Sequence, residues 1–215
     1  MERLVGQTTL IDTLGILLPG AVLLLVVNYY GFWDIALPWQ MLFGEGDIPM
    51  LVYFAGVSYL CGSAIHELGA YVERFLTWGP LRGVNLHAKY WKKKVVQEAY
   101  QICFKKEPPV GKEKDVRAEQ IKAGKEIFSY VQQGERPQRI ILFTAFYTMS
   151  RALVLALTCA VIVVIWGANG LENALWPILI CLVGIAIFFR RWRYFESKCL
   201  DEAYQLFIQH SKQTK

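Results

Sequence analysis

The sequence has few residues of the kinds that bind metals or form disulfides. It contains three histidines and five cysteines among its 215 residues. Cys61, Cys159 and Cys181 fall inside apolar stretches, and none of the five cysteines has the paired spacing of a metal site. The sequence therefore predicts no disulfide framework, no metal site and no cofactor.

Recognisable catalytic motifs are also missing. His66-Glu67-Leu68 resembles the start of a zinc-protease helix, but that motif needs a second histidine four residues after the first, where Ala70 stands. The chain also lacks a serine nucleophile motif with histidine and acid partners. These absences favour a protein that is not an enzyme. A membrane-embedded lipid-modifying enzyme that uses His66 and Glu67 is an alternative.

Lysine and arginine are absent from two connections of the chain. The segments Asn28–Asp47 and Gly167–Ala174 contain none, whereas Arg74–Arg139 contains 15 and the tail from Arg190 contains six. Cationic loops are retained on the cytoplasmic side of a membrane. The asymmetry therefore predicts a multi-pass protein of the cell inner membrane with both termini and the central segment in the cytoplasm.

Four long apolar stretches are what the sequence does contain. Hydrophobic residues make up 54% of the chain, and they are grouped in runs rather than spread at amphipathic spacing. About 20 apolar residues are enough to cross about 30 Å of hydrocarbon. The sequence thus predicts four transmembrane helices near Leu10–Tyr29, Ile48–Tyr71, Ala145–Trp166 and Leu171–Phe189.

The remaining segments also have helical patterns, so the predicted fold class is all-α. Tyr90–Phe104 and Asp115–Gln133 have amphipathic spacing and are joined by a charged Pro/Gly connector. An apolar stripe in Arg190–His210 is expected to pack on the central segment or on another copy. The predicted divisions are a transmembrane pair (1–76), a basic helical module (77–138), a second transmembrane pair (139–190) and a C-terminal helix (191–215).

Ionisable residues interrupt three of the apolar stretches. Asp12, Glu67 and Arg151 each lie about 4–6 Å inside the predicted cytoplasmic boundary, and His66 is next to Glu67. Unpaired charges are unfavourable at this depth, so pairing, water access or snorkelling is expected. One interpretation is an ion-pair belt that orients the bundle. The other is a charged gate at the cytoplasmic mouth of a pore.

Proline, glycine and alanine mark further positions within the apolar stretches. Pro19-Gly20 lies in the middle of the first stretch and predicts either a hinge or a kink covered by neighbouring helices. Small residues at helical spacing permit close packing in lipid, within one chain or between subunits. The predicted packing positions are Gly62, Gly69, Ala152, Ala156 and Ala160.

Aromatic residues accompany the clusters of positive charge. Such clusters bind anionic lipid headgroups, and they also bind nucleotides, oligonucleotides or acidic proteins. Both interpretations stay open for this basic cytoplasmic patch, which consists of Lys92, Lys93, Lys94, Arg190, Arg191 and Arg193.

The chain resembles the small four-span membrane proteins of bacterial anti-phage defence systems, such as the membrane subunit of Kiwa or the channel effector of Hailong. The resemblance lies in the patterns Leu14–Gly20 and Gly62–Gly69 and in the basic helical insert between the second and third spans. It implies a homo-oligomer, with a tetramer favoured, and a cytoplasmic protein partner. It also implies a pore-forming effector or a membrane sensor. The alternative is a membrane-anchored adaptor that recruits a soluble effector without conducting ions.

Overall fold

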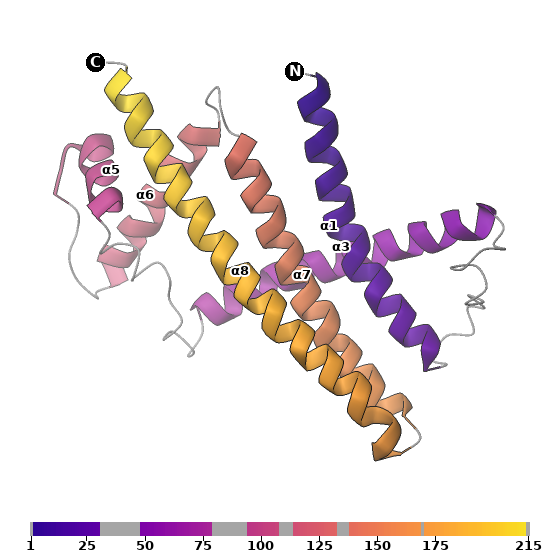
Figure 1. Cartoon of the computed structure of the whole chain (residues 1–215). Helices are drawn as coiled ribbons and strands as arrows, with labels where there is room; N and C mark the ends of the chain where they lie inside the picture. The colour runs from indigo at the N-terminus through magenta and orange to yellow at the C-terminus, as the bar shows by residue number, and fades with distance from the viewer. Residues whose placement is uncertain are drawn as a thin grey trace. The chain divides into compact units, whose positions relative to one another are not determined.

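The computed structural model describes residues 2–30, 48–78, 94–107, 114–132, 138–168 and 170–213. All regular secondary structure in these ranges is α-helical, which confirms the predicted fold class. The helices are α1 (Glu2–Tyr29), α3 (Ile48–Trp78), α5 (Lys94–Phe104), α6 (Lys114–Gln132), α7 (Gln138–Gly167) and α8 (Leu171–Gln213) (Figure 1).

The chain divides into two compact units. The apolar unit consists of Met1–Glu73 and Ala145–Tyr194, and the helical module consists of Arg74–Thr144 and Phe195–Lys215. The C-terminal segment, predicted as a cytoplasmic helix that continues the last span, shares a unit with the central segment from Phe195 onward. It is also the continuation of α8, which runs for 43 residues without a break.

Helices α7 and α8 form a hairpin in the apolar unit. The Ala168 N–H donates to the Val164 carbonyl at 3.0 Å, and the Gly170 N–H donates to the Ala168 carbonyl at 2.9 Å. Gly170 has a φ of 111°, a conformation that glycine adopts without steric strain. Further along, a Cβ on Gly184 of α8 would lie 2.9 Å from Leu157 Cδ1 of α7, so the two helices are closely packed there.

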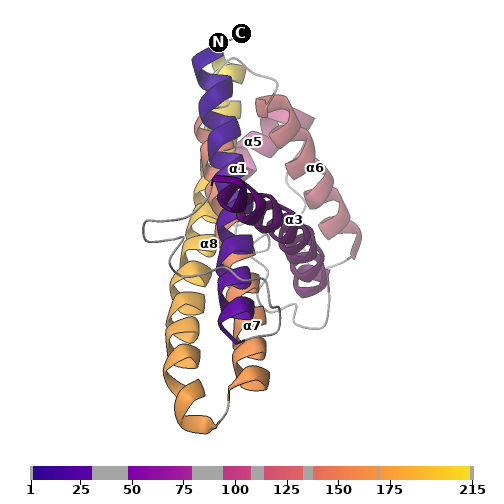
Figure 2. The ribbon, with the colours of Figure 1, turned by 90° about the vertical axis from the view of Figure 1, so that its right-hand side faces the viewer.

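Helices α1 and α3 cross with their backbones in contact. A Cβ added to Gly20 would lie 1.8 Å from the Ser58 carbonyl oxygen, and one added to Gly62 would lie 1.8 Å from the Ile16 carbonyl oxygen. These approaches are possible only because both positions are glycine. Figures 1 and 2 show that α3 crosses both α1 and α7 at a steep angle.

Two helices among the described residues are long and apolar enough to cross a membrane. They are Ile140–Gly167 in α7 and Glu172–Lys212 in α8, whereas the apolar part of α1, Thr13–Tyr29, is shorter. Helix α3 does not belong to this set. The structure therefore supports two of the four expected spans by length and composition.

Large hydrophobic side chains lie mostly on the outside of the apolar unit. Leu60 and Ile180 are each 69% exposed and Trp166 is 79% exposed, while Ala152 and Ala156 are fully buried. Only 11% of the apolar window of α8 is buried. A core helix of a water-soluble domain would bury its apolar side chains, so this distribution indicates an apolar solvent around the unit.

The helical module has the opposite distribution. One core cluster joins α5, α6, the first residues of α7 and the C-terminal part of α8 through large side chains, including Tyr100, Ile127 and Phe207. Charged side chains such as Lys105 and Lys122 are exposed. The predicted amphipathic helices correspond to α5 and α6, and the C-terminal stripe packs against them. This distribution is typical of a domain that folds in water.

Candidate functional site

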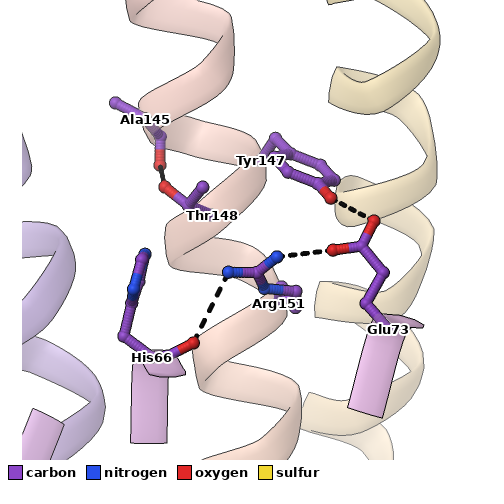
Figure 3. A network of polar contacts seen from close by, with 6 residues as sticks. All are labelled: His66, Glu73, Ala145, Tyr147, Thr148 and Arg151. Atoms are coloured by element: carbon purple, nitrogen blue, oxygen red, sulfur yellow. Dashed lines mark hydrogen bonds and ion pairs between the residues drawn. The ribbon is translucent and has the colours of Figure 1, made fainter. Parts of the chain in front are cut away.

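A buried arginine connects α3 and α7 within the apolar unit. Arg151 Nη1 donates to Glu73 Oε2 at 2.5 Å, and its Nη2 donates to the His66 carbonyl oxygen at 3.5 Å. The Tyr147 hydroxyl donates to Glu73 Oε1. Figure 3 shows these side chains converging between the two helices. We call His66, Glu73, Tyr147 and Arg151 the Arg151 network.

Helical spacing brings these four residues together. On α3, Glu73 follows His66 by seven residues, which is two helical turns, so both face the same neighbour. On α7, Arg151 follows Tyr147 by four residues. The guanidinium carbon lies 5.6 Å from the centre of the Tyr147 ring. The arginine is therefore held by a carboxylate, a carbonyl and an aromatic ring at once.

The Arg151 side chain packs against Gly69 of α3. A Cβ at this position would lie 3.4 Å from Arg151 Nε and 3.6 Å from its Cγ, so the arginine side chain rests on the glycine surface. A Cβ alone would make ordinary van der Waals contact with the arginine, whereas a longer side chain would compete for the space that the guanidinium stem fills. The glycine and the network thus form one structural feature.

Helix α8 also contacts the network through an aromatic ring. Trp192 is buried, and its ring centre lies 6.5 Å from that of Tyr147. Tyr147 therefore lies between the arginine of its own helix and a tryptophan of α8. Three helices of the apolar unit meet at this point.

Burial makes the ion pair strong and hard to separate. Only 8% of the Arg151 side chain and 20% of the Glu73 side chain is exposed. A charge left unpaired in such surroundings is strongly destabilising, commonly by about 3–5 kcal/mol. Both Glu73 oxygens accept hydrogen bonds, one from Arg151 and one from Tyr147. The arrangement holds α3 and α7 together.

The partner of Arg151 differs from the expected one. The sequence places Arg151 near Asp12 and Glu67, but Glu67 is exposed on α3 and the ion pair is made with Glu73. One residue along a helix is a rotation of about 100°, so Glu67 does not share the face of His66 and Glu73. The Asp12 side chain lies outside the described residues. Glu73 lies seven residues after His66, and this spacing is the sequence signal that would have placed both on one helical face.

The expected hinge at Pro19-Gly20 lies within a continuous helix. Helix α1 runs through Pro19, and both residues are buried. Gly20 is the point where α1 meets the backbone of α3. Close helix packing thus accounts for the glycine, and neighbouring helices cover the proline.

The expected packing residues lie at helix contacts of the apolar unit. Gly62 meets α1, and Gly69 meets Arg151. Ala152 and Ala156 form a buried cluster with Ile65 of α3, against which Leu23 of α1 and Leu155 also pack. Ala160 is fully buried as well. These contacts lie within a single chain.

The residues of the basic cytoplasmic patch are divided between the two units. Lys92 and Lys93 lie outside the described residues, and Lys94 is an exposed residue of the helical module. On α8, in the apolar unit, Arg190 and Arg191 are exposed and Arg193 is half-buried.

No group of three or more histidine, cysteine, aspartate or glutamate side chains in the described ranges is arranged to hold a metal ion. No protein-family model, curated protein or solved structure matches this chain.

Proposed function

We propose that this chain is a multi-pass inner-membrane protein whose helical module lies in the cytoplasm. The exposed apolar side chains of α7 and α8, together with the buried alanines between the helices, support this assignment. Helices in lipid associate through small residues and turn their large side chains outward. The charged surface and large-residue core of the helical module suit an aqueous compartment.

The proposal includes four spans with both termini in the cytoplasm. Its support is the charge asymmetry of the loops, because the cationic central segment resists translocation. In this topology α3 also spans the bilayer, so it lies more nearly along α1 and α7 than in the steep crossing that Figures 1 and 2 show. The Gly20–Gly62 contact is a point about which such a rotation could occur without separating the two helices.

Epitope accessibility in bacterial spheroplasts tests this topology. An epitope inserted within residues 31–47 is expected to react from outside, and an epitope next to Lys105 only after permeabilisation. If the epitope in residues 31–47 also needs permeabilisation, α1 and α3 do not both cross, and the four-span topology is wrong.

The function that the site supports best is conformational rather than enzymatic. A buried ion pair joins α3 to α7, and the Tyr147 hydroxyl, the His66 carbonyl and apolar side chains lie around it. An ion pair in these surroundings is either formed or broken, so it separates two discrete packings of α3. We infer that a signal received by the helical module, or a disturbance of the membrane, shifts the balance between these packings.

The resemblance to anti-phage defence proteins extends this proposal. On that basis the chain is a homo-oligomeric pore-forming effector or membrane sensor, with a tetramer favoured, and a cytoplasmic protein partner supplies the signal. The Arg151 network is the observation that carries the proposal, since rupture of the ion pair would allow the helices to repack. Pore opening and sensing share this step.

Ion flux from liposomes tests the role of the network. We expect the purified protein to form a discrete oligomer larger than a dimer. We also expect Arg151→Ala and Glu73→Gln to change basal ion leak in the same direction. Glu67→Gln is the matched control, because it removes the same charge from an exposed position of the same helix. A monomeric particle in mild detergent, or unchanged flux in both network variants, would contradict the proposal.

A membrane-anchored adaptor is the second candidate. The helical module has its own core and shares the continuous helix α8 with the apolar unit, which suits a docking platform for a soluble effector. An adaptor predicts no ion flux with or without cytoplasmic extract, and retention of a soluble protein from that extract on the immobilised full-length chain. Flux that depends on the extract would favour the pore instead.

A further inference from the structure

One side of α8 carries a continuous stripe of exposed side chains in the apolar unit. Its members recur at three- or four-residue steps, which places them on one face of a helix. Each of its apolar or aromatic members is at least 52% exposed. The stripe consists of Trp176, Ile180, Val183, Ile187, Arg190, Arg191 and Tyr194.

The opposite side of α8 is buried. Ala174, Cys181 and Trp192 are at most 7% exposed, and they follow one another by seven and eleven residues. Both intervals return to the same helical face. The stripe therefore points away from the rest of the apolar unit. Leu179 and Leu182, beside the stripe, are also exposed, so the outward apolar surface is broad. A broad surface fits surrounding lipid better than the narrow seam of a partner helix.

The ends of the stripe match the two interfaces of a bilayer. Trp176 and Arg190 are 14 residues apart, which corresponds to about 21 Å along a helix. Trp176 lies at one end, where tryptophan is favoured between headgroups and hydrocarbon. At the other end, the long arginine side chains extend outward and the Tyr194 hydroxyl lies one helical turn beyond Arg190. Their polar groups thus reach the headgroup level of a layer about 30 Å thick.

Among the residues that the structure describes, no carboxylate pairs with either arginine. Positions three and four residues before and after Arg190 and Arg191 contain no aspartate or glutamate. Arg151 of the same unit, in contrast, is paired with Glu73. The outward pair is therefore exposed and positively charged, and both guanidinium groups can bind an anion.

We propose that Arg190, Arg191 and Tyr194 form a binding site for the phosphate of an anionic phospholipid. Guanidinium groups bind phosphate oxygens through paired N–H donors, and the tyrosine hydroxyl supplies a third donor. The apolar residues of the stripe lie along the acyl chains of the same lipid. The site selects phosphatidylglycerol-like lipids over zwitterionic ones. This inference rests on the proposed membrane function.

Quenching of tryptophan fluorescence by brominated lipids tests the site. Because Trp192 lies on the buried side of α8, all chains compared carry Ile187→Trp, which adds a tryptophan on the stripe one helical turn before Arg190. The full-length protein is reconstituted in mixed phosphatidylglycerol and phosphatidylcholine vesicles, with either lipid brominated. The chain that retains both arginines should prefer phosphatidylglycerol. The variant Arg190→Gln/Arg191→Gln should lose at least about fivefold of this preference, since one interfacial cation contributes about that factor. Tyr194→Phe should lose a smaller part.

Lys105→Gln/Lys106→Gln is the matched control, because it removes the same net charge from two adjacent exposed positions of the helical module. Retained preference in this control supports the site. Equal losses in both double variants, or full preference in Arg190→Gln/Arg191→Gln, overturn it. Failure of the wild-type chain to resist alkaline extraction from vesicles would instead overturn the membrane function. Stable insertion without any lipid preference overturns the lipid site alone.

Discussion

The apolar unit and the helical module use the same type of secondary structure and differ in the side chains that they expose. The apolar unit buries Ala152, Ala156 and Gly62 and exposes residues such as Leu60. The helical module buries aromatic and branched residues and exposes lysines. In water, folding is driven by the removal of large apolar side chains from solvent. In lipid that gain disappears, so close contact between backbones decides which residues are buried.

The two units also handle polar groups differently. In the apolar unit, the buried guanidinium of Arg151 has a carboxylate partner on another helix. In the helical module, Lys212 and Glu98 form an exposed ion pair at 3.0 Å. The buried Arg151 needs its partner, because an isolated buried charge strongly destabilises the fold. The exposed pair of Lys212 and Glu98 contributes little to the free energy of unfolding. Substitutions should therefore have unequal effects in the two units.

The largest effect is expected from Glu73→Gln. It leaves Arg151 buried without its counter-ion and should destabilise the apolar unit by about 3–5 kcal/mol. Glu67→Gln, from an exposed position of α3, should change stability by less than about 0.5 kcal/mol. Chemical unfolding in mild detergent measures both. Equal effects of the two variants would mean that the ion pair does not stabilise the unit.

A loss of volume should be most damaging in the helical module. Ile127 is 1% exposed in its core, and Ile127→Ala should cost about 2–5 kcal/mol through lost burial and the cavity left behind. Leu60→Ala, at a position 69% exposed in the apolar unit, removes a similar volume without forming a cavity. Hydrogen exchange of the α5 and α6 amides should accelerate strongly only in Ile127→Ala. Unchanged exchange in that variant would contradict a water-type core.

A gain of volume should be damaging in the apolar unit. Gly62→Ala places a methyl group against the Ile16 carbonyl and should destabilise the α1–α3 contact by about 1–3 kcal/mol. Gly56→Ala is the control on the same helix, because a Cβ there meets nothing within 4 Å. It should be neutral or stabilising by up to about 1 kcal/mol, since alanine favours helix. Thermal unfolding in detergent should therefore shift in opposite directions.

The smallest effect concerns the response of the helical module to alkaline pH. Burial, followed by a 2.7 Å hydrogen bond to Glu119, raises the pKa of Tyr100 to about 12. Since the pKa is 10.0 in the unfolded chain, this contribution to stability is complete below pH 10 and is lost as pH rises toward 12.

Tyr100→Phe should therefore be less stable than wild type near neutral pH by about 1 kcal/mol, because it lacks the hydrogen bond. The gap between the two proteins should narrow between about pH 10 and pH 12, as measured by chemical unfolding with near-ultraviolet circular dichroism. A gap that widens over this range would mean that the phenol is not held in its protonated form.

Sequence patterns were sufficient for the fold class and for the approximate bounds of most helices. The amphipathic periods predicted 90–104 and 115–133, and the structure has α5 at Lys94–Phe104 and α6 at Lys114–Gln132. Apolar runs likewise identified α7 and α8. Such patterns depend on the local spacing of residues along one helix. They contain less information about which helix lies next to which.

The candidate site shows this division. The sequence singled out Arg151 and His66, because polar groups in apolar runs are conspicuous, and it singled out Gly69 as small. It did not identify Glu73, which follows the apolar stretch of α3. A charged residue just outside an apolar stretch is common, so its type and position alone do not indicate a buried ion pair. The steep crossing of α3 was also missed. The length and hydropathy of an apolar run indicate that a helix can span a membrane, but they do not give its direction relative to other helices.

By itself, then, the sequence determined that the chain is helical, where its long apolar runs lie and on which segments its positive charge is concentrated. These properties follow from the chemistry of successive residues. The tertiary structure decided that Arg151 pairs with Glu73, that Gly20 and Gly62 bring two backbones together, and that Arg190 and Arg191 face outward. Each of these depends on the relative rotation of helices or on the side of a helix left uncovered, and packing between distant segments sets both.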